Sequence, residues 1–191
     1  AERNFRQAIE LDENFADAHM NLATNLFMMG DIQNGWNEYE WRLKSENNKS
    51  PNRFFPQPQW DGSSLEGKSI LLWAEQGLGD EIRYASLIHD IIEAGGDVSI
   101  ECTPRLVDLF QRSFSQASVH AFPFLEAEKV EAMFDFQCPF AGLGRFLRPT
   151  VASFSKQQHA YLIADAQRQA FWRDRLAGIS GRPKIGINWR S

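Results

Sequence analysis

Residues 71–82 read LLWAEQGLGDEI, and this stretch decides the fold. An apolar run, a glycine-rich turn and a polar helix start follow one another, a pattern typical of the first strand, loop and helix of a parallel α/β unit. Ligands of open α/β sheets bind at the carboxyl ends of the strands, near such turns. Gly77 and Gly79 would let a ligand approach the backbone, and the helix start offers free amide groups.

Strand and helix patterns alternate from residue 68 onward. We expect strands over 69–74, 97–102, 117–122, 133–138 and 184–189, and helices over 80–93, 104–114, 125–132 and 164–176. Such alternation predicts a parallel sheet with helices on both faces, that is, a Rossmann-like domain.

Residues 1–43 have a helical period instead. Apolar residues recur at i, i+4 and i+8, as in the stripe formed by Ala18, Leu22, Leu26 and Met29, and short turns separate the stripes. The chain also echoes itself at a distance of 34 residues, where Phe5 aligns with Tyr39. Helix pairs of this period are typical of the tetratricopeptide repeat, although an ordinary helical hairpin would show the same stripes. Repeat arrays generally need about three or more units, and the chain starts within a helix, so we expect a fragment of a longer protein.

Between these two segments lies a stretch without periodicity, residues 44–67. It is polar at first, and Pro51, Pro56 and Pro58 discourage a helix. We expect a linker between domains whose aromatic residues, Phe54, Phe55 and Trp60, pack on a neighbour.

Composition limits the classes of function. The chain has 191 residues, of which 43% are hydrophobic and 24% charged, as in an ordinary globular protein. The net charge of −5 lies wholly in residues 1–43, which carry eight acidic and three basic residues, so a broad basic surface for nucleic acid is not indicated. No stretch approaches the roughly 18 apolar residues of a membrane helix, and no signal peptide is evident. We therefore expect no membrane span, no nucleic-acid partner and a cytoplasmic location.

Metal and cofactor sites are not expected either. Cys102, Cys138 and the four histidines share no metal-ligand spacing, and buried, reduced thiols are the simpler interpretation. The stretch 142–145, Gly-Leu-Gly-Arg, could bind an anion, but a turn into a short helix explains it more simply.

The loop after the first strand allows three chemical interpretations. Gly77 and Gly79 match the first two glycines of a dinucleotide fingerprint, and Glu101 lies about where a ribose-binding acid belongs. Against this, Ile82 replaces the third glycine, and Asp80 would repel the pyrophosphate. In the second interpretation Asp80, ionised at a helix N-terminus, acts as a general base on a sugar hydroxyl. In the third, Asp80 merely caps its helix.

The string 77–82 resembles the Gly-Asp loop of heptosyltransferase-type glycosyltransferases, which have the GT-B fold of two Rossmann-like halves. The wider pattern resembles bacterial tetratricopeptide-repeat proteins with a glycosyltransferase-like C-terminal region. In that group the repeats lead through a tryptophan-rich stretch, here 35–42 and 58–62, and a Gly-Lys strand start at 67–68 to the string at 74–80, Ala-Glu-Gln-Gly-Leu-Gly-Asp. This resemblance covers nearly the whole chain.

The resemblance implies a domain organisation. Residues 1–43 would be tetratricopeptide-repeat helices and 44–67 a linker. Residues 68–182 would be the Rossmann-like N-terminal half of a GT-B glycosyltransferase, and 183–191 the start of a truncated C-terminal half. The expected fold class is thus α plus α/β, with a helical hairpin followed by a parallel-sheet domain.

The resemblance also implies roles for individual residues. Asp80 would be the catalytic base, with Gln76, Gly77 and Gly79 shaping the acceptor pocket; Arg83, one turn further along the predicted helix, could face the same site. Arg190 and Ser191 would contact the donor phosphates, although Trp189–Arg190 stands where the family commonly has Pro-Gly or Ala-Gly.

Two functions are compatible with these expectations. In the first, the parent protein moves a sugar from a nucleotide-sugar donor to an acceptor hydroxyl while the repeats recruit a protein partner, and the fragment itself is inactive because most of the donor half is missing. In the second, the repeats form an interaction scaffold and the α/β domain is a degenerate, non-catalytic relative, as the altered donor turn suggests.

Overall fold

The computed structural model describes residues 1–45, 53–123, 133–156, 160–179 and 184–186. It opens with a helical unit, which we define as residues 2–44. This unit comprises the α-helices α1 (Glu2–Leu11), α2 (Ala16–Met29) and α3 (Ile32–Tyr39) and the 3-10 helix η1 (Glu40–Lys44). The helical period of the sequence is therefore confirmed.

The turns of the helical unit follow from local chemistry. Gly30 ends α2 in the left-handed conformation, with φ of 82°, which glycine adopts without steric cost. Asp31 then caps α3, its side chain accepting a hydrogen bond from the backbone N–H of Asn34. Within the predicted stripe of α2, Leu22 and Leu26 are buried as expected, but Met29 is exposed because it lies at the end of the helix.

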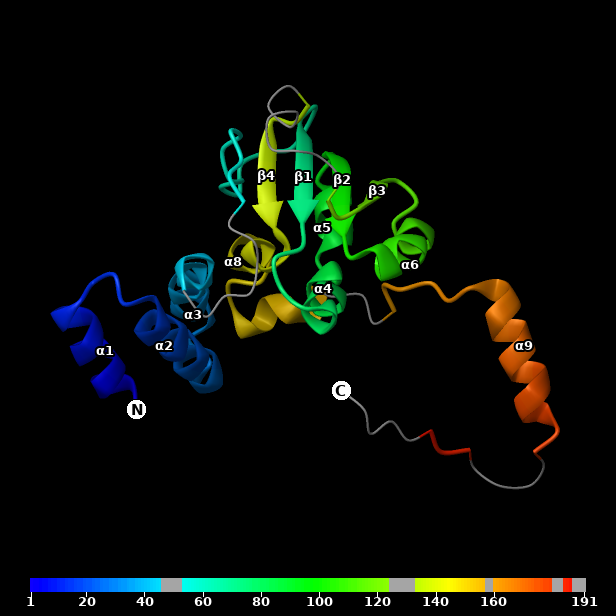
Figure 1. Cartoon of the computed structure of the whole chain (residues 1–191), viewed down its shortest axis with the longest axis horizontal. Coiled ribbons are helices and arrows are strands. Elements are labelled where there is room, and N and C mark those ends of the chain that lie inside the picture. Colours follow the sequence, from blue (N-terminus) through cyan, green and yellow to red (C-terminus); the bar gives the residue numbers. More distant parts are fainter. Residues whose placement is uncertain (46–52, 124–132, 157–159, 180–183, 187–191) are drawn as a thin grey trace.

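A four-stranded sheet forms the centre of the molecule (Figure 1). Its strands are β1 (Ser69–Trp73), β2 (Asp97–Cys102), β3 (Ser118–Ala121) and β4 (Phe136–Pro139). All neighbouring strands are parallel, in the order β3-β2-β1-β4, which confirms the predicted parallel sheet. The strand order reverses direction at β1, so the crevice between the carboxyl ends of β1 and β4 is the topological switch point of the sheet.

Helices connect and follow the strands. They are α4 (Leu78–Ala85), α5 (Ile88–Glu93), η2 (Pro104–Leu106), α6 (Val107–Ser113), η3 (Phe140–Leu143), α8 (Gly144–Leu147), η4 (Val151–Lys156) and α9 (Ala166–Ala177). The single helix expected over 80–93 was wrong, because the chain turns at Ser86 and Leu87 between α4 and α5. The strand expected at 184–189 is not formed by Lys184–Gly186, and its remainder lies outside the described residues, as does the helix expected at 125–132.

The two faces of the sheet are covered differently. Ile70, Leu72, Val98 and Ile100 belong to one buried cluster with residues of α4, α5 and α6. On the opposite face, the Trp73 ring lies 5.0 Å from that of Phe55, and Arg53 forms an ion pair with Glu101. Helices were expected on both faces, but these contacts on the second face come from an extended segment.

Residues 53–67, a described part of the stretch expected as a linker, pack on the α/β domain. Trp60 is buried, donates its indole N–H to the Ser63 carbonyl at 2.9 Å, and lies 5.1 Å from the Phe146 ring. Gln59 extends the sheet by a parallel bridge to Gln137 on β4. Phe54, in contrast, is exposed, so the expectation that all three aromatic residues pack on a neighbour was wrong for this one.

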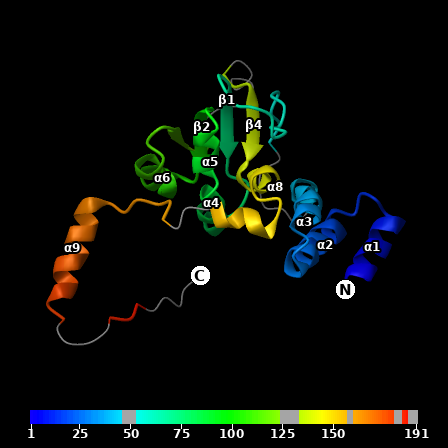
Figure 2. The same ribbon diagram turned by 180° about the vertical axis from the view of Figure 1, so that it is seen from behind.

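The helical unit and α9 lie on opposite sides of the sheet in both views (Figure 2). The helical unit lies close to the carboxyl ends of β1 and β4, and α3 contacts α8. Helix α9 stands apart from the sheet in both views, and none of its residues is buried.

Candidate functional site

The predicted site lies in the glycine loop, which we define as residues 75–80, at the carboxyl end of β1 (Figure 1). Gly77 is the N-cap residue of α4, and its carbonyl accepts hydrogen bonds from the N–H groups of Asp80 and Glu81 at 2.8 and 3.0 Å. The strand, turn and helix start that the sequence predicts are therefore present at this position.

Asp80 lies in the first turn of α4 with 35% of its side chain exposed. Nη1 of Arg83, on the next turn, lies 3.9 Å from the Asp80 carboxylate, and the Arg83 side chain is 72% exposed. A pair this long and this exposed contributes little to stability. The structure thus presents the carboxylate and the guanidinium on the same outer side of α4, accessible to a ligand.

Gly77 and Gly79 face open space. A methyl group at either position would meet no other atom within 4 Å, and neither residue has a positive φ. The fold itself therefore does not require glycine at these positions. Space left free beside a backbone turn suits the close approach of a ligand.

Gln76 has a partner inside the protein. Its side-chain Nε2 donates to the Tyr39 hydroxyl at 3.0 Å, and the Tyr84 hydroxyl lies 3.4 Å from the same oxygen. Tyr39 ends α3, so Gln76 links the glycine loop to the helical unit. Burial is the main reason why the pKa of Tyr84 is raised, so this phenol stays protonated.

Glu75, the first residue of the glycine loop, is a buried acidic residue, which the sequence analysis did not predict. Its side chain is 1% exposed and pairs with Arg42 of η1, which is 3% exposed; Nη2 of Arg42 lies 3.1 Å and Nε 3.2 Å from Glu75 Oε1. The backbone N–H of Ala141, just after β4, donates to the same oxygen at 3.3 Å. This pair therefore joins the helical unit to both strands of the switch point.

Burial and pairing shift the pKa values of Glu75 and Arg42 in opposite directions. Burial raises the pKa of Glu75, and the charge of Arg42 and the Ala141 N–H only partly offset it. For Arg42, burial lowers the pKa, but the charges of Glu75 and Glu40 more than offset this, and the guanidinium stays charged. Its Nη1 also donates to Glu40 at 2.8 Å and to the Tyr39 carbonyl at 3.1 Å.

Glu81 is a second buried carboxylate that sequence reasoning missed. It follows Asp80 on α4, but it points inward, accepting hydrogen bonds from the backbone N–H of Thr103 at 2.8 Å and from the Thr103 hydroxyl. Thr103 follows β2, so this contact fixes α4 against the neighbouring strand end. Of the two adjacent acids, only Asp80 is partly exposed to solvent.

Trp36 of α3 completes the cover over the switch point. Its indole N–H donates to the Arg148 carbonyl at 2.8 Å, and its ring fills the space beside Gly144, where a methyl group would overlap it. The stretch 142–145 is thus a turn into the short helix α8, as the simpler interpretation predicted.

The alternative dinucleotide interpretation is not favoured by the geometry. Glu101, the proposed ribose-binding acid, is buried and ion-paired with Arg53, whose guanidinium also lies over the rings of Phe55 and Trp73. The predicted donor-phosphate contacts, Arg190 and Ser191, lie outside the described residues.

Other chemistry is limited in the described part of the chain. Cys102 and Cys138 are buried free thiols, and burial raises the pKa of Cys102 to about 12. Nowhere among the described residues do three or more metal-ligating side chains gather, and no described helix is long and apolar enough to cross a membrane.

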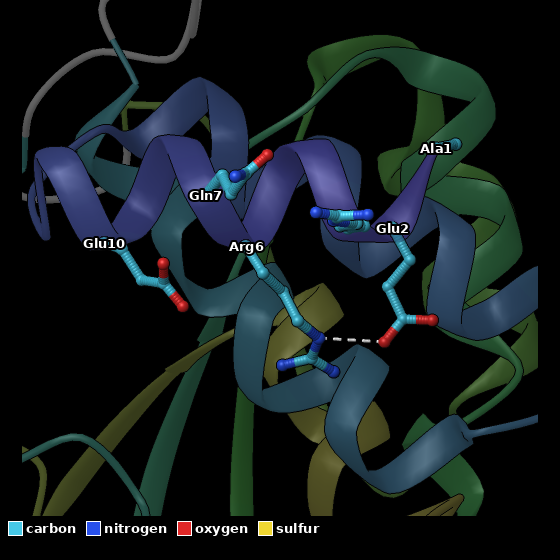
Figure 3. Close-up of a pocket in the computed structure, with 6 residues that line it drawn as sticks. Ala1, Glu2, Arg6, Gln7 and Glu10 are labelled. Atoms are coloured by element: carbon cyan, nitrogen blue, oxygen red, sulfur yellow. Dashed lines mark hydrogen bonds and ion pairs between the residues drawn. The ribbon is translucent and has the colours of Figure 1, made fainter.

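A hollow along α1 is lined by Ala1, Glu2, Arg3, Arg6, Gln7 and Glu10 (Figure 3). All of its lining residues lie at or near one helix, and an ion pair among them, Arg6–Glu2 at 2.8 Å, is exposed to solvent. We therefore do not assign a binding site to this hollow.

The chain is similar in sequence to a curated bacterial protein. Protein FlbA of Caulobacter vibrioides is 35% identical over 185 residues, which cover 88% of this chain and 30% of that protein. The chain therefore spans less than a third of the length of this relative. No family model matches the chain, and no solved structure matches it.

Proposed function

We propose that the α/β domain belongs to a glycosyltransferase-like protein that moves a sugar from a nucleotide-sugar donor to an acceptor hydroxyl. One observation supports this most: a partly exposed carboxylate, Asp80, lies in the first turn of a helix beside two glycines whose surroundings are open. A fixed carboxylate within hydrogen-bond reach of a hydroxyl is what general base catalysis needs.

In this proposal the chain binds the acceptor and supplies the base. Asp80 accepts the proton of the acceptor hydroxyl while that oxygen attacks the sugar carbon and the nucleotide leaves. Arg83, on the same outer side of α4, is placed to orient an acceptor. Gly77 and Gly79 leave room for it, whereas Gln76 shapes the loop through Tyr39. The donor would bind in a second Rossmann-like half, with Arg190 and Ser191 at its start, in the cytoplasm.

The helical unit would act as tetratricopeptide repeats that recruit a protein acceptor or partner. The paired helices α2 and α3, and the close contact of α3 with α8, are compatible with such a unit fixed to the catalytic domain. Because the unit covers the switch point, a recruited protein would lie near the glycine loop.

The test uses the full-length protein with nucleotide-sugar donors and candidate protein acceptors, and mass spectrometry to detect the added sugar. We expect transfer by the wild type and by Asp108→Asn, a matched control at an exposed acid in the first turn of α6. We expect none by Asp80→Asn. Full transfer by Asp80→Asn would contradict the proposed role.

A second candidate function is a non-catalytic interaction scaffold. It is favoured by the cover over the switch point, where Trp36 and the Arg42–Glu75 pair fill the crevice that usually binds ligands in open α/β sheets. Failure of the folded full-length protein to bind any nucleotide-sugar, together with capture of a partner by the helical unit, would support this function instead.

A further inference from the structure

We propose that Tyr39 and Arg42 are positioning residues, through which the helical unit holds the glycine loop and its Asp80 in place. This inference rests on the proposed function, because it concerns the placement of the proposed base. It assigns a second task to the helices: besides recruiting a partner, they form part of the support of the site.

Two consecutive side chains of the loop carry this inference. Glu75 is bound by Arg42, and Gln76 is bound by the Tyr39 hydroxyl. The three residues that follow Gln76 include two glycines, whose backbone has no side chain to anchor it. The contacts made at 75 and 76 therefore hold the loop where it leaves β1, while the Glu81–Thr103 contact holds α4, where the loop ends.

The Arg42–Glu75 contact is buried and the Tyr39–Gln76 contact is partly buried, so both are better suited to holding the loop than to binding a substrate. The Arg42–Glu75 pair is almost fully buried and extends to the backbone of Ala141 beyond β4. Arg42 is itself held by the Tyr39 carbonyl, so the two positioning residues form one unit at the end of α3. Asp80 remains exposed a few residues away.

The arrangement has a consequence for catalysis. A displacement of about 1 Å of a catalytic group can reduce a rate about 100-fold even when every reacting group is present. Loosening the loop should therefore lower the kcat of transfer to the acceptor. The KM for the nucleotide-sugar donor, which binds in the other half, should stay unchanged.

Hydrogen exchange on the full-length protein tests the support directly and does not need activity. The amides of Asp80 and Glu81, both bonded to the Gly77 carbonyl, report opening of the loop. Tyr39→Phe removes one hydroxyl and keeps the ring, which lies edge-on to Phe27 and Trp36. We expect about fivefold faster exchange at these amides, the effect of one lost hydrogen bond, and a larger effect in Arg42→Met.

Two matched controls separate this effect from general destabilisation. Tyr161→Phe removes a phenol that donates to the Ile82 carbonyl, outside the loop, and Arg148→Met breaks a buried pair with Asp90 elsewhere. Exchange at Asp80 and Glu81 no faster in Tyr39→Phe than in Tyr161→Phe would overturn the inference. If Arg42→Met fails to fold, the comparison of Tyr39→Phe with Tyr161→Phe is sufficient to test the inference.

Kinetics give the second readout. We expect Tyr39→Phe to lower the kcat of transfer several-fold while donor KM and melting temperature stay close to the wild type. An unchanged kcat would overturn the inference. A wild type that folds but transfers no sugar would refute the proposed function, and the exchange measurement would still decide whether the helices hold the loop.

Discussion

Replacing Arg42 by methionine tests how far the buried ion pair stabilises the molecule. Methionine keeps much of the side-chain volume but leaves Glu75, 1% exposed, without its cation. At pH 7 the stranded carboxylate either stays charged in the interior or takes up a proton. Protonation at pH 7 of a carboxyl whose unfolded pKa is about 4.3 costs about 3.7 kcal/mol, which sets the ceiling for this contribution.

The expected destabilisation is about 2–3 kcal/mol at pH 7. It lies below the ceiling because burial already raises the pKa of Glu75 in the wild type, so part of the cost is present before the change. Removing one partner of a buried pair costs about 3–5 kcal/mol in other proteins, which is of the same order.

The destabilisation should depend on pH in a defined direction. Without Arg42, the folded-state pKa of Glu75 rises further above its unfolded value. Such a carboxyl contributes stability that is fully present below the unfolded pKa of about 4.3 and is lost as the pH rises through the folded-state pKa. The deficit of Arg42→Met should therefore be largest at pH 7 and shrink toward pH 5, by up to about 1.4 kcal/mol per pH unit.

Urea unfolding followed by circular dichroism at pH 5, 6 and 7 measures this dependence. The double variant Arg42→Met/Glu75→Gln is the control, because it removes the titrating group and should show no such change with pH. If Arg42→Met lowers the free energy of unfolding by the same amount at pH 5 and pH 7, the stranded carboxylate of Glu75 is not the cause of the destabilisation.

Three further predictions concern packing and charge. Gly144→Ala should lower the free energy of unfolding by about 1–3 kcal/mol, because the new methyl group overlaps the Trp36 ring; an unchanged urea midpoint would argue against this contact. Gly79→Ala should leave stability unchanged or raise it by up to about 1 kcal/mol, while sugar transfer falls; equal losses of both would mean that the glycine serves the fold. Asp135, whose pKa is lowered by the Ser69 N–H and by Lys68, stabilises the fold above its unfolded pKa of about 3.9, and this contribution is lost as the pH falls through its lowered pKa. Asp135→Ala should therefore melt earlier than the wild type at pH 7, and this difference should shrink as the pH falls below about 3.9; equal melting at pH 7 would contradict this.

The sheet and the position of the loop were predictable because local signals decide them. The apolar run of β1 is followed at once by glycines and an acidic helix start, and such strands alternate with helices along the chain. Asp80 was correctly placed in the first turn of a helix for the same reason. The break between α4 and α5 escaped prediction because neither glycine nor proline marks residues 86–87.

The support of the loop could not be predicted, because it depends on residues far apart in the chain. Arg42 and Glu75 are 33 positions apart, and charged residues are expected at the surface unless a partner is known. The same holds for Glu81, which is adjacent to Asp80 in sequence but points inward to Thr103. Helical period shows that these two neighbours point in different directions, but it does not show which of them faces inward or that Thr103 is the partner.

The central claim is that Asp80 activates the acceptor hydroxyl. The most direct measurement is the single-turnover rate of sugar transfer by the full-length protein and by its Asp80→Asn variant, at saturating nucleotide-sugar donor. We expect a rate lower by about 10²- to 10⁴-fold in the variant, with unchanged affinity for the donor. Rates within about twofold of each other, far less than the loss expected on removal of a general base, would contradict the proposed role of Asp80.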